Sequence, residues 1–162
     1  MRSSFQSNYN LLSGGQESCD VVYRSSLIEG DFLTIAQENR EKDIVMGRTT
    51  GGVHKDDLVF MMNDQRLKIF GSQGQLKSYI LSLKLAQYIE IKQAKQVHPV
   101  LLMDDVFDKL DADRVTRLLR LLNKVVGGQI FITDKDVKTI PLILDPLSID
   151  YRIFEIENGQ VI

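Results

Sequence analysis

The sequence is poor in the residues that stabilise secreted or metal-clustered proteins. Its 162 residues include one cysteine, Cys19, and three prolines. A lone cysteine excludes an internal disulfide framework and a cysteine-based metal cluster, so a reducing cytoplasm is its simplest setting. No apolar run reaches the ~18–20 residues that span a bilayer, and residues 1–10 lack the apolar core of a signal peptide. We therefore expect a cytoplasmic protein with no membrane partner.

The chain also lacks a strong charge of either sign. Its formal net charge is -2, so global charge gives no argument for nucleic-acid binding, and any DNA contact would need a local basic patch. With 43% hydrophobic residues it can bury a sizeable core. Its length suits one domain or one lobe of a larger one.

Hydrophobic periodicity predicts an α/β chain that begins rich in strands. The expected elements are strands within 1–30, a helix over 30–44, a loop over 47–57, a hairpin joining 58–62 to 66–70, a helix over about 75–94, a strand at 100–103, a helix from 111 to 126, a strand at 129–133 and a hairpin over 151–162. The strand–helix–strand order from 99 to 133 indicates a βαβ unit in a parallel sheet. Ligands of such sheets lie beyond the carboxyl ends of the strands.

The strongest chemical pattern is an apolar strand that ends in two adjacent carboxylates, Asp104 and Asp105. The first can hold Mg²⁺, which prefers hard oxygen ligands. The second can orient or deprotonate an attacking water, as phosphoryl transfer requires. The alternative is a structural one, because acids end strands in many α/β proteins.

A glycine-rich turn, GSQGQ at residues 71–75, opens the long helix. Exposed N–H groups at a helix N-terminus favour an anion, the two glycines permit close approach, and Ser72 adds a hydroxyl donor. Taken alone, this turn is better explained as a flexible helix cap.

Together these motifs resemble the RecF branch of the ABC-type ATPase superfamily. The segments that carry the resemblance are GSQGQLKSYILSLKLAQY, LLMDDVFDKLD and QIFIT. TTGGVHKDD at 49–57 is similar to a further motif of the family, except that Val53 stands where the family usually has proline. The resemblance covers most of the chain and is strongest from residue 49 to 133.

The resemblance implies a fold and a division of the chain. The fold would be α/β, the C-terminal lobe of an ABC-ATPase head, with a mixed sheet flanked by helices and with β-hairpins. Residues 1–46 would be the end of a preceding lobe, a hairpin plus a helix. Residues 47–162 would be the C-terminal portion of the head.

The resemblance also implies roles for individual residues. The signature motif, which contacts ATP bound by the partner subunit, would be Gly71, Ser72, Gln73, Gly74 and Gln75. Asp104 would bind Mg²⁺, Asp105 would be catalytic, and Leu110 and Asp111 would form the D-loop. Asp111 also suits an ordinary helix N-cap.

The switch position of the family aligns with Asp134, next to Thr133. A carboxylate cannot donate a hydrogen bond to a terminal phosphate as a histidine can. Thr133 or Lys135 are therefore the alternatives for that role.

A second sequence, Leu12-Ser13-Gly14-Gly15-Gln16, matches the ABC signature letter for letter. A signature needs a helix behind it, and residues 17–24 alternate as a strand does. We therefore interpret 12–16 as a hairpin turn.

No stretch reads G-x-x-x-x-G-K-[ST], the loop that cradles the β- and γ-phosphates. The resemblance places that loop on the N-terminal side of everything seen here. We therefore expect this chain to be the C-terminal part of a slow ATPase. By itself it should neither bind ATP tightly nor hydrolyse it, and calorimetry with ATP would test the binding.

Weaker patterns remain open. His54, Asp56 and Asp57 are few ligands for a metal-binding site, and a structural or DNA-proximal loop is the favoured interpretation. Lysines on the long helix can meet DNA phosphates or simply form a solvated face; they are Lys77, Lys84, Lys92 and Lys95.

For the whole protein, the resemblance implies an ATP-driven homodimer that binds DNA at single/double-strand junctions near gaps. It would act with RecO and RecR to help load the recombinase, and its cofactors would be ATP and Mg²⁺. The alternatives are another SMC- or Rad50-like head and a non-catalytic dimerisation or DNA-binding module. An SMC- or Rad50-like head carries long coiled-coil arms, and these residues show no sustained heptads, which argues against that alternative.

Overall fold

The computed structural model describes residues 1–28, 30–135, 139–147 and 149–162. Contacts divide the chain into two compact units, one of residues 1–17 with 72–162 and one of residues 18–71. In the described part of the chain the strands form three small sheets. No helix among the described residues is both long and apolar enough to cross a membrane.

The first unit contains the predicted βαβ segment. Its elements are α1 (Arg2–Ser13), α4 (Gln73–Lys95), β4 (Leu101–Met103), α5 (Ala112–Val125), β5 (Ile130–Ile132), α6 (Thr139–Leu144), the 3-10 turn η3 (Asp145–Leu147), β6 (Ile156–Glu157) and β7 (Gln160–Val161). Strands β4 and β5 pair in parallel, with Leu101 opposite Ile130 and Met103 opposite Ile132. Both predicted strands and the helix between them are confirmed.

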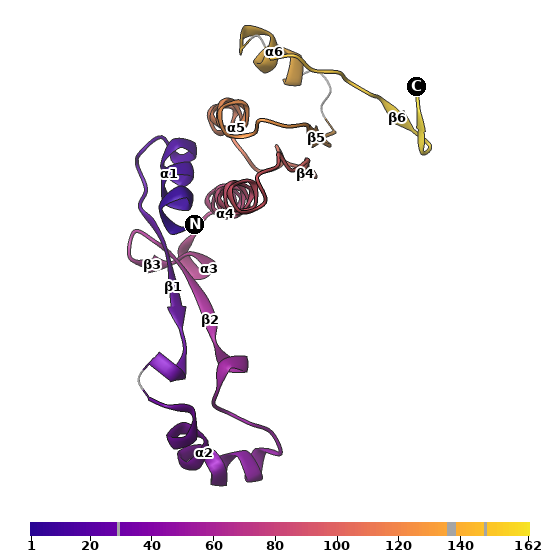
Figure 1. Ribbon diagram of the computed structural model, residues 1–162. Helices are drawn as coiled ribbons and strands as arrows, with labels where there is room; N and C mark the ends of the chain where they lie inside the picture. The colour runs from indigo at the N-terminus through magenta and orange to yellow at the C-terminus, as the bar shows by residue number, and fades with distance from the viewer. Residues whose placement is uncertain (29, 136–138, 148) are drawn as a thin grey trace. The chain divides into compact units, whose positions relative to one another are not determined.

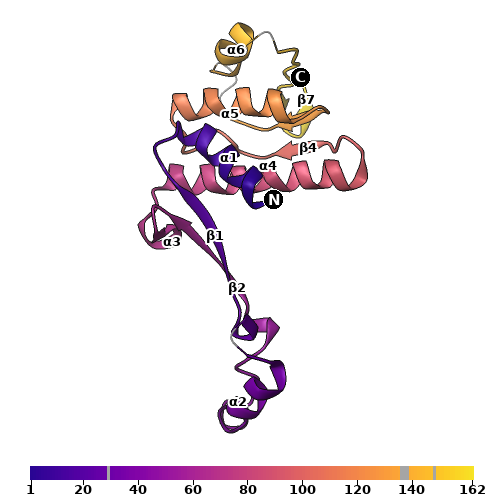
Figure 2. The same ribbon diagram turned by 60° about the vertical axis from the view of Figure 1, so that its left-hand side comes forward.

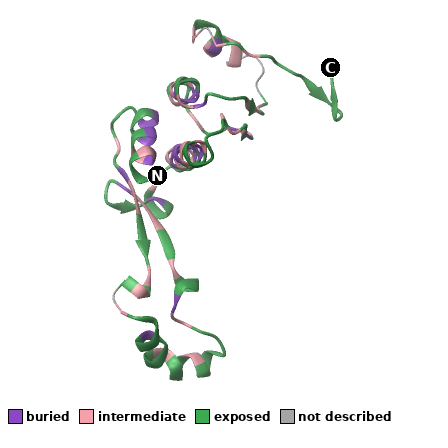
Figure 3. Cartoon of the chain, viewed as in Figure 1, coloured by how far each residue is buried: buried purple, intermediate pink, exposed green. Residues whose placement is uncertain are grey.

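Helices α1, α4 and α5 enclose the core of this unit (Figures 1 and 2). Leu85 of α4 and Leu118 of α5 are fully buried, and Val106 after β4 is nearly so. The buried residues gather on the facing sides of these helices (Figure 3). The apolar stripe of α5 at helical spacing therefore faces the core as predicted.

Helix α1 corrects the prediction of strands at the N-terminus. Phe5, Tyr9 and Tyr79 of α4 are fully buried, and the Phe5 and Tyr79 ring centroids lie 4.7 Å apart. The apolar residues Phe5, Tyr9 and Leu12 recur at helical spacing within an otherwise polar segment. These three positions follow the i, i+4, i+7 spacing of a helix, but the stripe has only three members in a mostly polar segment, and the prediction missed it.

The second unit is built on an antiparallel ribbon. Its elements are β1 (Cys19–Arg24), the 3-10 turn η1 (Ser26–Ile28), α2 (Phe32–Met46), the 3-10 turn η2 (Val53–Lys55), β2 (Asp57–Met62), β3 (Gln65–Arg66) and α3 (Leu67–Phe70). Strands β1 and β2 pair from Cys19 opposite Met62 to Arg24 opposite Asp57, side by side in Figure 1. The predicted helix over 30–44 is confirmed as α2.

The hairpin predicted to join 58–62 to 66–70 is confirmed at β2 and at its turn, but the prediction of a second strand is wrong beyond Arg66, since β3 covers Gln65–Arg66 alone. Asn63 and Asp64 form the turn with φ of 46° and 61°. The chain then becomes helical at α3, where Leu67 is 1% exposed and Ile69 is 64% exposed. Leu67 is the buried residue of this short helix, whereas Ile69 and Phe70 are exposed, so the packing of Leu67 fixes its position.

The C-terminal hairpin matches its prediction. Ile156 lies opposite Val161, and the turn residues Asn158 and Gly159 have φ of 51° and 77°. Positive φ at both central residues is what an Asn-Gly hairpin turn requires.

Candidate functional site

The carboxyl ends of β4 and β5 bring the two predicted acids against Thr133. The Thr133 N–H donates to the Met103 carbonyl at 3.0 Å, which continues the strand pairing by one residue. The Thr133 hydroxyl donates to a carboxylate oxygen of Asp104 and accepts from the Asp105 N–H at 3.0 Å. One hydroxyl therefore links the side chain of the first acid to the backbone of the second.

Asp105 sits in a tight turn that a second side chain holds. Its φ is 48°, a left-handed conformation that surrounding contacts must stabilise in a residue with a side chain. The Lys77 ammonium of α4 donates to the Asp105 carbonyl at 2.8 Å. Lys77 is thus a support of the acidic turn, in contrast to the DNA-facing or solvated role considered from the sequence.

The acidic turn fits the way proteins bind Mg²⁺. Asp104 is exposed and Asp105 half-buried, and both offer hard oxygen ligands. Among the described residues no three His, Cys, Asp or Glu side chains form a set able to hold a metal. Mg²⁺ typically takes one or two carboxylates and completes its shell with water and substrate phosphates, so two acids are a sufficient protein contribution.

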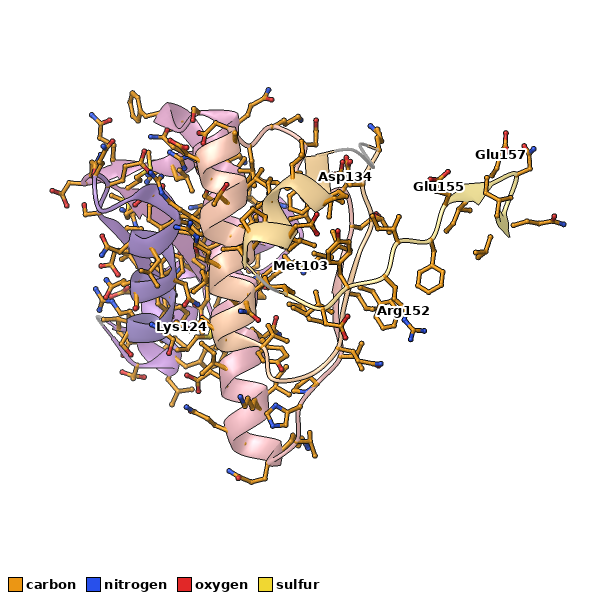
Figure 4. The ribbon with its side chains drawn as sticks, turned by 90° about the horizontal axis from the view of Figure 1, so that it is seen from above. Met103, Lys124, Asp134, Arg152, Glu155 and Glu157 are labelled. Atoms are coloured by element: carbon orange, nitrogen blue, oxygen red, sulfur yellow. The ribbon has the colours of Figure 1, made fainter. Side chains whose placement is uncertain are left out.

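Asp134 lies in the segment that follows β5 and is labelled in Figure 4. One of its carboxylate oxygens accepts from the Phe107 N–H at 3.3 Å. Asp134 thus supports the segment after the acids. Asp105, Asp134 and Lys135 also line a cavity of about 320 Å³, whose apolar wall comes from α5 and α6.

The predicted signature turn begins α4 with reciprocal hydrogen bonds. The Gln75 N–H donates to the Ser72 hydroxyl oxygen at 3.2 Å, and the Ser72 N–H donates to the Gln75 side-chain carbonyl at 2.8 Å. This capping box fixes the turn in place. Because the Ser72 oxygen accepts, its proton stays available for a ligand.

Both glycines of the turn lie where a side chain would not fit freely. A Cβ on Gly71 would come within 2.7 Å of the Leu67 carbonyl oxygen. A Cβ on Gly74 would come within 3.1 Å of the Lys109 carbonyl oxygen, in the loop before the predicted D-loop residues. The start of α4 and this loop therefore approach each other closely.

Leu110 and Asp111 end that loop. Leu110 is half-buried against the core, and the Asp111 carboxylate accepts from the Arg114 N–H at 2.7 Å. Asp111 is therefore the N-cap of α5, as predicted from its position. Its contact with a partner subunit stays a prediction.

Glu17 is a central residue that the sequence did not reveal. Its carboxylate accepts from the Gln75 amide at 2.9 Å, from Arg114 at 3.1 Å and from the Tyr9 hydroxyl at 2.5 Å. Gln75 and Arg114 lie 58 and 97 residues away along the chain, so no local pattern signals the contacts.

The surroundings of Glu17 keep it ionised. Burial alone would raise its pKa, but the hydrogen bonds from Tyr9 and Gln75 and the charge of Arg114 outweigh burial, so the pKa lies below its usual value. Burial, followed by the bond to Glu17, raises the pKa of the Tyr9 phenol. At neutral pH the pair is therefore a carboxylate and a neutral phenol.

Residues 12–16, which match the ABC signature sequence at every position, lie at the C-terminal end of α1. Ser13 is the last residue of α1, and Gly14 caps it with φ of 76°. Residues 19–24 then form β1, so the prediction that no helix follows Gln16 is confirmed. The turn joins a helix to a strand instead of two strands. A helix C-terminus presents carbonyl groups, which repel phosphate.

The segment with His54 and Asp56 forms local contacts. The His54 ring hydrogen-bonds to Thr49, and Asp56 accepts from the Tyr23 hydroxyl, which raises the pKa of Tyr23. These contacts agree with a structural loop.

The sequence is similar to curated RecF proteins over nearly its whole length. It is 40% identical over 157 residues to the DNA replication and repair protein RecF of Cytophaga hutchinsonii, covering 97% of this chain and 42% of that protein. The RecF of Phocaeicola vulgatus is 42% identical over 159 residues, with coverage of 98% and 43%. The chain thus spans about two fifths of the length of these relatives. No protein-family model matches it.

A solved structure shares the fold. The recombination mediator protein RecF–ATPrS in the RecFOR pathway superposes with a TM-score of 0.68 at 23% identity, covering 99% of this chain and 42% of that one. A RecF–ATP structure of the same pathway gives 0.66 over 85% of this chain and 38% of the other, also at 23% identity. These likenesses confirm the α/β fold class. The chain belongs to the RecF family and corresponds to the C-terminal part of its members.

Proposed function

We propose that the chain is the C-terminal part of an ATP-dependent DNA-binding recombination-repair protein that dimerises on ATP. The observation that carries the proposal is the acidic turn at Asp104 and Asp105, hydrogen-bonded to Thr133 and Lys77. The same unit begins α4 with the capped signature turn at Ser72. The curated relatives are named DNA replication and repair proteins, and a related RecF structure is described with ATP.

The acidic turn would act on the terminal phosphate of ATP. Asp104 would hold Mg²⁺, which when bound would neutralise charge on the β- and γ-phosphates. Asp105 would orient the attacking water and accept its proton. Thr133 would keep both acids in register, and Lys77 would hold the turn from the side of α4.

The signature turn would complete the site of a second subunit. The Ser72 hydroxyl and the first N–H groups of α4 would face the terminal phosphate bound by the partner. Asp111 would lie beside the same interface. Because each subunit would lend this turn to the other, ATP would join the two heads.

The wider role is proposed from the similarity to the family. The dimer would bind DNA at single/double-strand junctions near gaps and act with RecO and RecR to help load the recombinase. The solved RecF relatives support this role, since they are described as recombination mediators in the RecFOR pathway.

An Asp105→Asn variant of a full-length protein carrying this segment tests the catalytic proposal. The amide cannot accept a proton from water, so ATP turnover should fall by about 100-fold or more, as general bases contribute that much. Dimerisation on ATP, measured by light scattering, should persist. Unchanged turnover would contradict the role of Asp105, and Asp113→Asn on α5 is the matched control.

A further inference from the structure

We propose that Glu17 is a positioning residue that ties the signature turn at the start of α4 to the D-loop at the start of α5, through Arg114. The inference rests on the proposed function, because it assumes that Ser72 and Asp111 act at an ATP-dependent interface. Glu17 lies outside both motifs, in the segment just after α1.

On one side Glu17 holds the signature turn. Its Oε1 accepts from the Gln75 Nε2 at 2.9 Å. The other end of the Gln75 amide accepts from the Ser72 N–H at 2.8 Å. Because Gln75 is held at both ends, its amide has one orientation, and the Ser72 hydroxyl has a fixed position above the helix.

On the other side Glu17 holds Arg114, which spans three elements. One guanidinium nitrogen donates to Glu17 at 3.1 Å and another donates to the Ser78 hydroxyl of α4 at 3.0 Å. The Arg114 Nε lies 3.4 Å from a carboxylate oxygen of Asp111. A continuous polar chain thus runs from Ser72 through Gln75, Glu17 and Arg114 to Asp111.

The middle of this polar chain, formed by Glu17 and Arg114, is shielded from solvent, whereas its ends at Ser72 and Asp111 are exposed. The Glu17 and Arg114 side chains are 14% and 15% exposed, and the Tyr9 hydroxyl occupies the second Glu17 oxygen. A pair of this kind depends on both partners, because removing one leaves the other charged and poorly solvated. Glu17 is therefore tightly bound to its partners, in contrast to a surface acid.

The two loops that it joins lie close together. A Cβ on Gly74 would come within 3.1 Å of the Lys109 carbonyl oxygen. The apolar core holds the bodies of α4 and α5 through Leu85 and Leu118, whereas the polar chain lies at the helix ends that bear the motif residues. Loss of Glu17 should therefore release these ends with little effect on the core.

The test compares Glu17→Gln and Arg114→Lys with matched controls in a full-length protein carrying this segment. Arg120→Ala removes an exposed charge farther along α5, and Glu41→Gln on α2 is the matched acid-to-amide control outside the network. ATP-driven dimerisation of Glu17→Gln should weaken about tenfold, the effect of one charge-assisted hydrogen bond. Arg114→Lys keeps the positive charge but loses the guanidinium group that reaches Glu17 and Ser78 at once, so it should weaken ATP-driven dimerisation by less than tenfold. The controls and the ATP affinity of the monomer should not change. The thermal midpoint of each variant is measured beside its dimerisation, because Glu17→Gln leaves Arg114 without its charged partner and is expected to lower the midpoint.

A cycle with Ser72→Ala separates positioning from general stability. If Glu17 acts through the signature turn, the double variant Glu17→Gln with Ser72→Ala should be no weaker in dimerisation than the worse single variant. Additive losses, or wild-type dimerisation by Glu17→Gln, would overturn the inference.

The proposed function fails in a different way. If the wild-type protein does not dimerise on ATP, the proposed role of the signature turn is wrong. If wild type dimerises and Glu17→Gln matches it, this inference alone is wrong.

Discussion

Two side chains, Thr133 and Lys77, hold the acidic turn at Asp104 and Asp105 in place through hydrogen bonds. The Thr133 hydroxyl serves Asp104 and the backbone of Asp105 at once, and the Lys77 ammonium serves the Asp105 carbonyl. Threonine can do this because a hydroxyl both donates and accepts. Asp134 cannot donate when ionised, and here it accepts from a backbone N–H.

Cys19 gives a prediction at the same scale. It is buried, and burial, followed by the charge of Asp20, raises the pKa of its thiol to about 12. The thiolate is the reactive form, so below that pKa the native protein keeps Cys19 unreactive, and reactivity appears only as pH rises toward it. At pH 8, iodoacetamide should modify Cys19 at least about a hundredfold more slowly in native than in denatured protein.

Mass spectrometry of the modified peptide follows Cys19 directly. Protein unfolded in guanidinium is the control, because its thiols have ordinary pKa values. Equal rates in the native and unfolded states would show that Cys19 is accessible and ionised more easily than its surroundings imply.

Among the elements, α5 connects the candidate site to the core of the first unit. It carries Asp111 and Arg114 at its start and a buried stripe along its length. Leu118→Ala should destabilise the protein by ~2–5 kcal/mol, because Leu118 is fully buried and its removal leaves a cavity. The measurement is the thermal unfolding midpoint.

Arg120→Ala on the exposed side of α5 is the matched control for that prediction. It should stay within about 0.5 kcal/mol of wild type, as surface substitutions do. If both variants lowered the midpoint equally, packing of α5 against α4 would not be what stabilises this unit.

Elements with a wide or strongly periodic signal could be predicted from the sequence. Helix α5, the β4–β5 pair and the Asn158-Gly159 hairpin are examples, because each depends on local spacing or turn chemistry. Helix α1 could not, since its buried stripe is narrow and depends on the aromatic contacts with Tyr79. The same holds for α3, a short helix that tertiary packing of Leu67 decides.

The residues of the candidate site also divide into those that could be predicted from the sequence and those that could not. Asp104, Asp105, Ser72 and Gln75 stand out because their motifs are contiguous. Glu17 has no contiguous motif, and its partners come from helices far along the chain. Hydrogen-bond networks of this kind depend on the folded arrangement and carry no periodic signal.

At the scale of the whole molecule, the parallel β4–β5 pair is a small sheet with an apolar face to cover. Leu102 and Phe131 lie opposite each other and are 73% and 53% exposed. Parallel sheets are normally covered on both faces. The chain spans 42% of its relative from Cytophaga hutchinsonii, and we expect the rest of a RecF-like protein to cover this face and supply the phosphate-binding loop.

The proposal that each signature turn serves the partner subunit is tested most directly by mixing two inactive proteins. Full-length Asp105→Asn lacks the base, and full-length Ser72→Arg blocks the signature turn. A dimer of one of each has one site made of the intact acids of one subunit and the intact signature of the other. Since half the dimers in an equal mixture are mixed, ATP turnover should recover to roughly a quarter of wild type. Turnover no greater than the sum of the two variants alone would contradict action across the dimer.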